Sequence, residues 1–253
     1  MNLIKTPEEI KILRAGGRIL AATLKQVAAA VKPGVTTLEL NALAEKLLRG
    51  AGAEPSFLNY STHGSSPYPA TLCTSVDSEV VHGIPKSSVI LKTGQIIGLD
   101  LGCCYQGLFT DSAITVPVGK IDDPAVKLIQ VARDSLVEAI KRVKAGATLG
   151  DIGFAVQSYI EKNGFSVVRD LVGHGVGYAV HEEPAVPNFG KAGAGMKLKS
   201  GMVIAIEPMV NIGDWQVKVL DDNWTVATMD GSLSAHFEHT VVVTDDGCEV
   251  LTQ

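Results

Sequence analysis

The first 31 residues place apolar side chains three or four positions apart, which is the spacing of one face of an α-helix. Thr6-Pro7-Glu8-Glu9 precedes this pattern as a capping box with proline at the first helical position, and Lys32-Pro33-Gly34 stops it. A second helix is predicted from Thr36 or Thr37, and Gly50 and Gly52 end it. The chain therefore opens with two amphipathic helices.

The same pattern returns 112 positions later, where Gly164 takes the place of Gly52. Lys144-Ala145-Gly146 replaces the earlier Lys-Pro-Gly stop between the two helices. The apolar positions of the repeated helices are Ala125, Ile129, Ala132, Leu136 and Val143 in the first and Ile152, Ala155 and Tyr159 in the second. Chance similarity between helices is common, so this match alone does not establish an internal duplication.

Two apolar runs supply a second repeat, because residues 91–100 and 198–207 each end in one carboxylate, at an offset of 107. Runs rich in Ile, Val and Leu are typical of buried strands, where an unpaired charge would shift its pKa or destabilise the site unless a cation held it. Asp100 and Asp111 should lie directly opposite each other on a hairpin that turns near Tyr105-Gln106. Glu207 and Glu238 form the matching pair, with a further strand predicted around residues 215–228.

The order of elements predicts an α+β fold with internal duplication. Each half has two helices followed by strands with an acid pair, and no Pro-, Ser- or charge-rich linker divides the halves. We therefore predict one domain over residues 1–253, with pseudo-twofold halves of about 1–120 and 121–253. A central antiparallel or mixed sheet should be covered by helices on one side.

Composition limits the function classes only slightly. The formal net charge of −5 argues against a nucleic-acid footprint over a whole face. The four cysteines, Cys73, Cys103, Cys104 and Cys248, fit no zinc-ribbon spacing and indicate a reducing compartment. The chain has no signal-peptide pattern at its start and no run of 18 apolar residues. A cytoplasmic protein is expected.

Four carboxylates and one imidazole are the candidate metal ligands: Asp100, Asp111, His174, Glu207 and Glu238. Carboxylates about 4 Å apart repel by on the order of 4 kcal/mol per pair at an effective dielectric of about 20. Two divalent cations would remove this repulsion and could activate a water for hydrolysis. Any one of these acids alone is better explained by a salt bridge or a surface position, but four in a duplicated arrangement are not.

The segment 173–184 contains His174 and a second histidine, His181, and its three glycines in five residues forbid a helix that would place both on one face. Two different roles are therefore more natural than two metal ligands. A phosphate-binding loop is the competing interpretation, but GxGxG without a preceding strand and a following helix is weak support for it. His82, in His82-Gly83-Ile84-Pro85, would alone be read as a structural histidine; near two metals it becomes a candidate donor to substrate.

At this point the sequence resembles the type I methionine aminopeptidases over essentially its whole length. The resemblance rests on Glu79–Pro85, Asp100 with Asp111, Gly173–Gly177 with His181–Pro184, Gly201–Met209 and Phe237–Thr240. It implies the pita-bread fold, a dinuclear metal centre and removal of the initiator methionine from nascent proteins. The absence of an N-terminal extension resembles the short bacterial form, and the 25 residues between His181 and Glu207 leave no room for the insertion of the type II enzymes.

The same resemblance implies a role for each candidate ligand. Asp100 would chelate the first metal, Asp111 and Glu238 would bridge both metals, and His174 with Glu207 would complete the second. The metals would be Mn, Fe, Co or Zn, because an oxygen-rich set with one imidazole accepts all four.

The resemblance also implies that His82, His181 and Glu207 act in catalysis. His181 would stabilise the oxyanion, His82 would bond the scissile amide region, and Glu207 would shuttle a proton. The α-amine of the substrate should sit near Asp100 and its metal, which would restrict cleavage to the N-terminal residue.

By resemblance, the methionine pocket is lined by Phe57, Tyr60, Tyr68, Cys73, Val180 and Trp224. The sequence departs from the family pattern by extra residues from Ser61 to Pro67, by Val180 in place of an aromatic residue or leucine, and by His236 in place of glutamine. Strand periodicity puts His236 on the same face as Glu238, so it either supports the ligands or is linked to solvent. Cys103 and Cys104 are predicted to pack in a turn.

Two other functions compete with this interpretation. The first is a proline-specific peptidase of the same fold, although such chains usually carry a long N-terminal domain. The second is a non-catalytic binding homologue, which would be expected to have lost ligands that are all present here. The expected partners are nascent polypeptide N-termini and, transiently, the ribosome, with no nucleic-acid function, no membrane association and a monomeric state.

Overall fold

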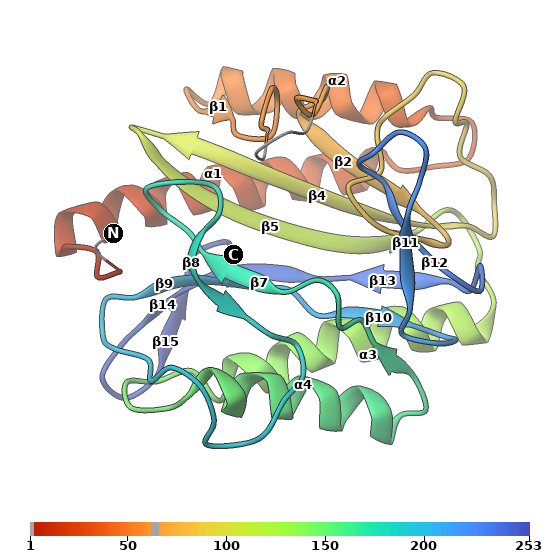
Figure 1. Ribbon diagram of the computed structural model, residues 1–253. Coiled ribbons are helices and arrows are strands. Elements are labelled where there is room, and N and C mark those ends of the chain that lie inside the picture. The colour runs from red at the N-terminus through yellow and green to blue at the C-terminus, as the bar shows by residue number, and fades with distance from the viewer. Residues whose placement is uncertain (1–2, 62–65) are drawn as a thin grey trace.

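The computed structural model describes residues 3–61 and 66–253 (Figure 1). Its four helices in these ranges are α1 (Pro7–Ala30), α2 (Thr37–Gly50), α3 (Asp123–Ile140) and α4 (Leu149–Lys162). Thr6, Thr36 and Thr148 each begin a helix in a capping box. In each box the threonine hydroxyl accepts a hydrogen bond from the backbone N–H of the third helical residue, and the carboxylate of that residue accepts one from the threonine backbone N–H. The four predicted helices are therefore confirmed, with the predicted starts of the first two at Thr6 and Thr36. Val143, predicted on the third helix, lies beyond its end at Ile140.

The main sheet contains nine strands within the described residues, and every pair in it is antiparallel. The order is β1-β4-β5-β14-β9-β7-β8, with β2 also on β4 and β15 also on β14. Their bounds are β1 Glu54–Pro55, β2 Leu72–Val76, β4 Ile96–Tyr105, β5 Leu108–Pro117, β7 Gly173–Gly175, β8 Glu182–Val186, β9 Val203–Ile206, β14 Glu238–Val243 and β15 Cys248–Val250.

Two smaller sheets flank the main one. The first joins β13 (Ser234–His236), β10 (Met209–Asn211) and β6 (Ser166–Val167). The second joins β11 (Val217–Val219), β12 (Val226–Thr228) and β3 (Glu79–Val81). The strand predicted around residues 215–228 is thus two short strands, and they pair with β3 rather than with the main sheet.

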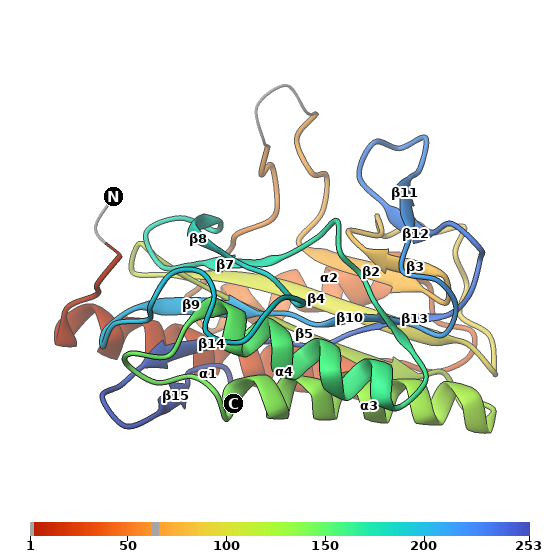
Figure 2. The same cartoon turned by 60° about the horizontal axis from the view of Figure 1, so that its bottom comes forward.

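Helices cover one face of the main sheet and leave the other to loops. α1 packs on β4 and β5, and α3 contacts β5, β9 and β14. In Figure 2 these helices and α4 lie beneath the sheet, while the described residues on either side of 62–65 and the β11–β12 hairpin rise above it. Among the described residues, none of the helices has the length and apolar character needed to cross a membrane.

The duplication predicted from the sequence is visible in the helices and at the centre of the sheet. α2 and α4 are both 14 residues long, and their first residues, Thr37 and Leu149, are 112 positions apart. β5 of the first half pairs with β14 of the second half, so the two halves meet where the acid pairs lie. The buried apolar side chains form one cluster around α1, α2 and β4 and another around α3, α4, β9 and β14.

The hairpin of β4 and β5 differs from the prediction by its register. Asp100 pairs with Ala113, and Asp111 pairs with Gly102, so the two acids are diagonal neighbours rather than directly opposite. The reason is the turn, which Gln106 and Gly107 form with left-handed φ angles of 50° and 82°, one residue later than expected. Because side chains alternate with a period of two, both acids still share one face.

This register also corrects the prediction that Cys103 and Cys104 pack in a turn. Both lie in β4, where Cys103 pairs with Thr110 and Cys104 with Phe109. They are therefore strand residues and not turn residues; Cys103 is buried, and both thiols are free.

Candidate metal centre and active-site pocket

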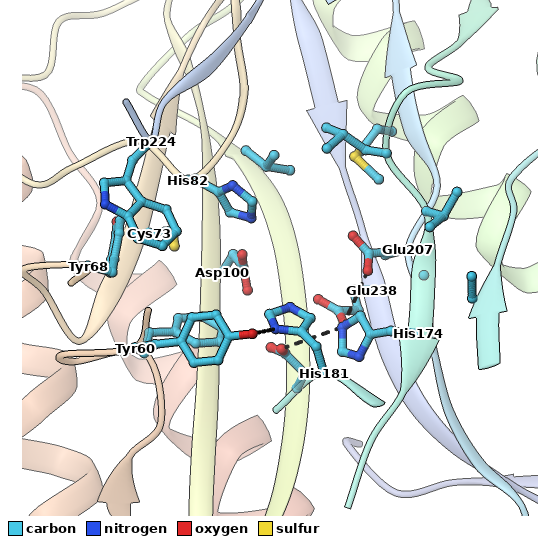
Figure 3. A pocket seen from close by; sticks show the side chains of 18 of the residues that line it. Tyr60, Tyr68, Cys73, His82, Asp100, His174, His181, Glu207, Trp224 and Glu238 are labelled. Atoms are coloured by element: carbon cyan, nitrogen blue, oxygen red, sulfur yellow. Dashed lines mark hydrogen bonds and ion pairs between the residues drawn. The ribbon is translucent and has the colours of Figure 1, made fainter. Parts of the chain in front are cut away.

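The five candidate ligands converge on one point of the sheet, and Figure 3 shows four of them, Asp100, His174, Glu207 and Glu238. Asp100 lies in β4, Asp111 in β5, His174 in β7 and Glu238 at the start of β14, while Glu207 directly follows β9. Three overlapping groups have ligand atoms within 4.8 Å of one another: Asp100, Asp111 and Glu238; His174, Glu207 and Glu238; and Asp111, His174 and His181. The acids of both halves therefore form one cluster, as the sequence predicts.

The imidazole of His174 faces three of the acids. Its Nε2 lies 3.5 Å from Glu207 Oε1, 3.9 Å from Glu238 Oε1 and 4.0 Å from Asp111 Oδ2. Its Nδ1 lies 2.9 Å from the carbonyl oxygen of Gly175. Because a carbonyl can only accept, Nδ1 carries the proton and the neutral ring turns its Nε2 lone pair toward the acids. This is the orientation that a metal-ligating histidine requires.

Burial makes the carboxyl groups hard to ionise together. It raises the pKa of Asp111 and of Glu207 to about 8, and the charge of Glu207 adds to the effect on Asp111. Burial and the neighbouring Asp111 raise the pKa of Asp100 and of Glu238 well above the usual range. Among the described residues, Asp100 Oδ1 and Glu238 Oε1 are buried without a hydrogen-bond partner. A divalent cation would satisfy these oxygens and balance the charge.

His181 lies between this cluster and the aromatic wall of the pocket. Its Nδ1 is 2.7 Å from the hydroxyl oxygen of Tyr60, and its ring centroid is 4.3 Å from that of His174. Desolvation lowers the pKa of His181, while desolvation and the charge of Asp111 raise the pKa of Tyr60. Both groups are therefore neutral at pH 7.

His82 follows β3 with a left-handed φ of 60°, a backbone strain that often marks functional positions. Its ring meets the indole of Trp224 edge-on at 6.2 Å between centroids. Burial, followed by the charges of His181 and His236, lowers the pKa of His82 to about 4. The side chain is thus a neutral imidazole on the rim of the site.

The His236 side chain lies beside the carboxylate cluster, on the face that strand periodicity predicts for it. Its Nε2 lies 3.6 Å from Glu207 Oε2 and is buried, with no hydrogen-bond partner among the described residues. The hydroxyl of Thr115 accepts from the His236 N–H and donates to the His236 carbonyl, which fixes this residue on β5. His236 therefore supports the ligand set and is not linked to solvent.

A pocket of about 620 Å³ opens beside the cluster. Its lining includes all five candidate ligands, His82 and His181, and the predicted pocket residues Phe57, Tyr60, Tyr68, Cys73 and Trp224. Tyr68 and Trp224 meet edge-on at 5.3 Å between ring centroids. Val180 is the exception, because it packs in the same apolar cluster but does not line the pocket.

The extra residues from Ser61 to Pro67 fall partly outside the described residues, which exclude 62–65. The described part reaches the pocket wall, since the indole Nε1 of Trp224 donates to the carbonyl oxygen of Ser66 at 3.0 Å.

Several lining residues were not predicted, among them Leu171, Val172, Glu182 and Met209. Leu171 and Val172 directly precede the motif Gly173-His174, whereas Glu182 and Met209 lie within the motifs His181–Pro184 and Gly201–Met209. Their position beside or within these motifs is the sequence signal that could have identified them as pocket residues.

Comparison with known proteins places this geometry in context. Residues 11–245 match the model of metallopeptidase family M24. The chain is 48% identical to a methionine aminopeptidase of Clostridium perfringens, covering all of this chain and 99% of the other. It is 47% identical to methionine aminopeptidase 1 of Bacillus subtilis, covering both chains completely.

Solved structures agree with these matches. The methionine aminopeptidase of Rickettsia prowazekii superposes with a TM-score of 0.95 at 41% identity over 99% of each chain. An Xaa-Pro dipeptidase of Bacillus anthracis shares the fold at a TM-score of 0.78 and 24% identity, and this chain covers 62% of it. The expected pita-bread arrangement of helices on a curled antiparallel sheet is confirmed.

Proposed function

The chain belongs to metallopeptidase family M24 as an enzyme of the methionine aminopeptidase type, and we propose that it removes the initiator methionine from nascent proteins with a small second residue. The observation that carries this proposal is the juxtaposition of buried acids and an apolar aromatic pocket in one cavity. The identity of 48% to a methionine aminopeptidase, against 24% to an Xaa-Pro dipeptidase, favours methionine over proline specificity.

Two divalent ions fit the donor set. Asp100, Asp111 and Glu238 would hold one, and His174, Glu207 and Glu238 would hold the other. Asp111 would serve this second ion as well, because its Oδ2 lies 4.0 Å from His174 Nε2. When bound, such ions polarise a carbonyl and lower the pKa of an attacking water. Mn, Fe, Co and Zn all accept this oxygen-rich set with one imidazole.

Glu207 is suited to move the proton of the reaction. Its carboxylate lines the pocket beside the His174 ring, within reach of a water placed among the acids. We infer that it takes a proton from the attacking water and returns it to the leaving amine. The His236 ring lies beside the other oxygen of this carboxylate, with Nε2 at 3.6 Å from Oε2.

His181 would donate a hydrogen bond to the oxyanion. The hydroxyl of Tyr60 donates to Nδ1 in this proposal, which leaves the proton of the neutral ring on Nε2. His82 would bond the scissile amide region from the opposite rim. An oxyanion donor of this kind contributes about 10²- to 10³-fold to kcat.

The pocket would hold the methionine side chain against Phe57, Tyr68, Cys73 and Trp224, whose apolar and aromatic surfaces suit a thioether. The substrate α-amine would lie near Asp100, which restricts cleavage to the first residue. His82 and His181 would then crowd the second residue and exclude large side chains.

The biological setting follows from this substrate. We infer that residues 1–253 act as one catalytic domain, because β5 of one half pairs with β14 of the other. The enzyme would work as a cytoplasmic monomer on nascent chains, in transient contact with the ribosome.

Steady-state kcat/KM on a Met-X-Ser peptide series tests the proposal. We expect efficient cleavage when X is Gly, Ala or Ser and poor cleavage when X is Leu, Lys or Phe. Ala-Pro-Ser serves as the control for proline specificity and should not be cleaved. A flat profile across X would remove the initiator-methionine role while leaving aminopeptidase chemistry in place.

A further inference from the structure

A buried ion pair joins the N-terminal segment (residues 3–6) to the loop that carries His181. Lys5 Nζ contacts Glu182 Oε1, and the two side chains are only 1% and 3% exposed. The ammonium also lies 4.2 Å from the centroid of the Tyr178 ring. The other oxygen of Glu182 accepts from the Tyr178 N–H at 3.2 Å. The ammonium of Lys5 and both oxygens of Glu182 therefore each have a partner.

The Lys5 end of the pair is fixed to the sheet. The Lys5 N–H donates to the carbonyl oxygen of Gly201 at 2.8 Å, and Ile4 forms a β-bridge with Met202, directly before β9. The Lys5 stem passes so close to Gly177 that a Cβ there would lie 2.5 Å from Lys5 Cε. Gly177 also has a φ of 139°, which suits glycine. The ammonium is thus held at a defined point under the loop.

The Glu182 end of the pair is next to the proposed oxyanion donor. Glu182 lines the pocket and begins β8, and His181 is the last residue of the loop before it. Removing two charges from water offsets most of their attraction, so a buried pair is weak support for stability alone. Its geometric demands, in contrast, restrict where the loop can lie.

We propose that the Lys5–Glu182 pair is a positioning device for His181, which places its ring between Tyr60 and the reacting carbonyl. This inference rests on the proposed function of His181. Lys5 does not touch substrate, and its effect on the reaction passes through the loop of residues 176–181.

A second ion pair, formed by the helix that follows residues 3–6, provides a matched control. Arg14 of α1 binds Glu249 of β15 with distances of 2.5 and 2.8 Å, and their side chains are 31% and 39% exposed. This pair also ties the start of the chain to the sheet, but its two side chains bind each other and not the loop of residues 176–181. Arg14→Met should therefore leave kcat unchanged.

The test measures kcat, KM and metal content for Lys5→Met and Glu182→Gln, each in the wild-type and in a His181→Ala background. His181→Ala alone should lower kcat by about 10²- to 10³-fold. Each pair variant should lower kcat by about 10- to 10²-fold through misplacement of the ring, with metal content and KM little changed. In the His181→Ala background neither variant should lower kcat further.

Glu182→Gln keeps the acceptor for the Tyr178 N–H and is the variant to use if Lys5→Met fails to fold. In it, the ¹⁵N NMR signals of the His181 ring should shift, while those of the His82 ring stay in place. Unchanged His181 signals, an unchanged kcat, or an equal loss of kcat in both backgrounds would overturn the positioning role. Full activity of His181→Ala would instead overturn the proposed function of His181, whatever the Lys5 variants do.

Discussion

The carboxylate cluster and the aromatic wall of the pocket face each other across one cavity but are built differently (Figure 3). The acids lie on or directly after paired strands of a duplicated sheet, where hydrogen-bonded ladders fix their positions. Tyr60 and Tyr68 come from the irregular segment between β1 and β2, and Trp224 comes from the turn between β11 and β12. The sheet therefore sets the chemistry and the loops set the selectivity, so the two should be separable by mutation.

The largest effect is expected from the cluster. Asp111→Ala should abolish measurable turnover, at least 10³-fold, and lower metal content, because Asp111 is proposed to serve both ions. Bound metal after dialysis, measured by atomic absorption, and kcat/KM on Met-Ala-Ser check this prediction.

Asp111→Asn provides the control, since it keeps the shape of the side chain but removes its charge. It should lose metal as well. Normal metal content together with normal turnover in either variant would contradict the ligand assignment.

A smaller effect is expected from a substitution in the aromatic wall of the pocket. Trp224→Ala should raise KM for Met-Ala-Ser by about tenfold, because it removes the apolar partner of Tyr68. Metal content should not change. Trp215→Ala is the matched control, because Trp215 packs over Arg169 and does not line the pocket. Loss of metal in Trp224→Ala would show that the two regions are not separable.

The smallest effect concerns the stability of the metal-free protein. Asp111 and Glu207 have pKa values of about 8, above the ordinary values of 3.8 and 4.5. The folded state thus binds more protons than the unfolded state, and the free energy of unfolding falls as pH rises from about 4 to about 8. Burial lowers the pKa of His82 to about 4 and of His174 and His236 to about 3, so these residues destabilise the fold mainly below about pH 6.5.

Between pH 7 and 8 the carboxyl effect outweighs the histidine effect, because unfolded histidines are mostly deprotonated there. Scanning calorimetry of the metal-free protein should show Tm falling over this interval, by roughly 2–4 °C for each kcal/mol lost. Saturating Mn²⁺ should remove the fall, because metal replaces the protons. A Tm that rises with pH in the metal-free protein would contradict the assignment of raised pKa values.

The same contrast explains how much the sequence reveals. Period-two alternation and the repeat bring the acids to one face, and the capping box at Thr6 gives the start of the first helix. The register of the hairpin depends on which residues adopt left-handed φ, and Gln106 is not an obvious choice for it. The apolar pattern likewise cannot distinguish Val180, which packs behind the wall, from residues that line it. The Lys5–Glu182 contact joins residues 177 positions apart and has no local signal.

Calorimetric titration of Mn²⁺ into the metal-free protein at pH 7 tests the central claim that the buried acids hold two divalent cations. Carboxyl groups with pKa values of about 8 are protonated at this pH, so binding must release protons. The account predicts two ions per chain and a heat that changes with the ionisation enthalpy of the buffer. Binding of fewer than two ions per chain, or a heat independent of the buffer, would contradict it.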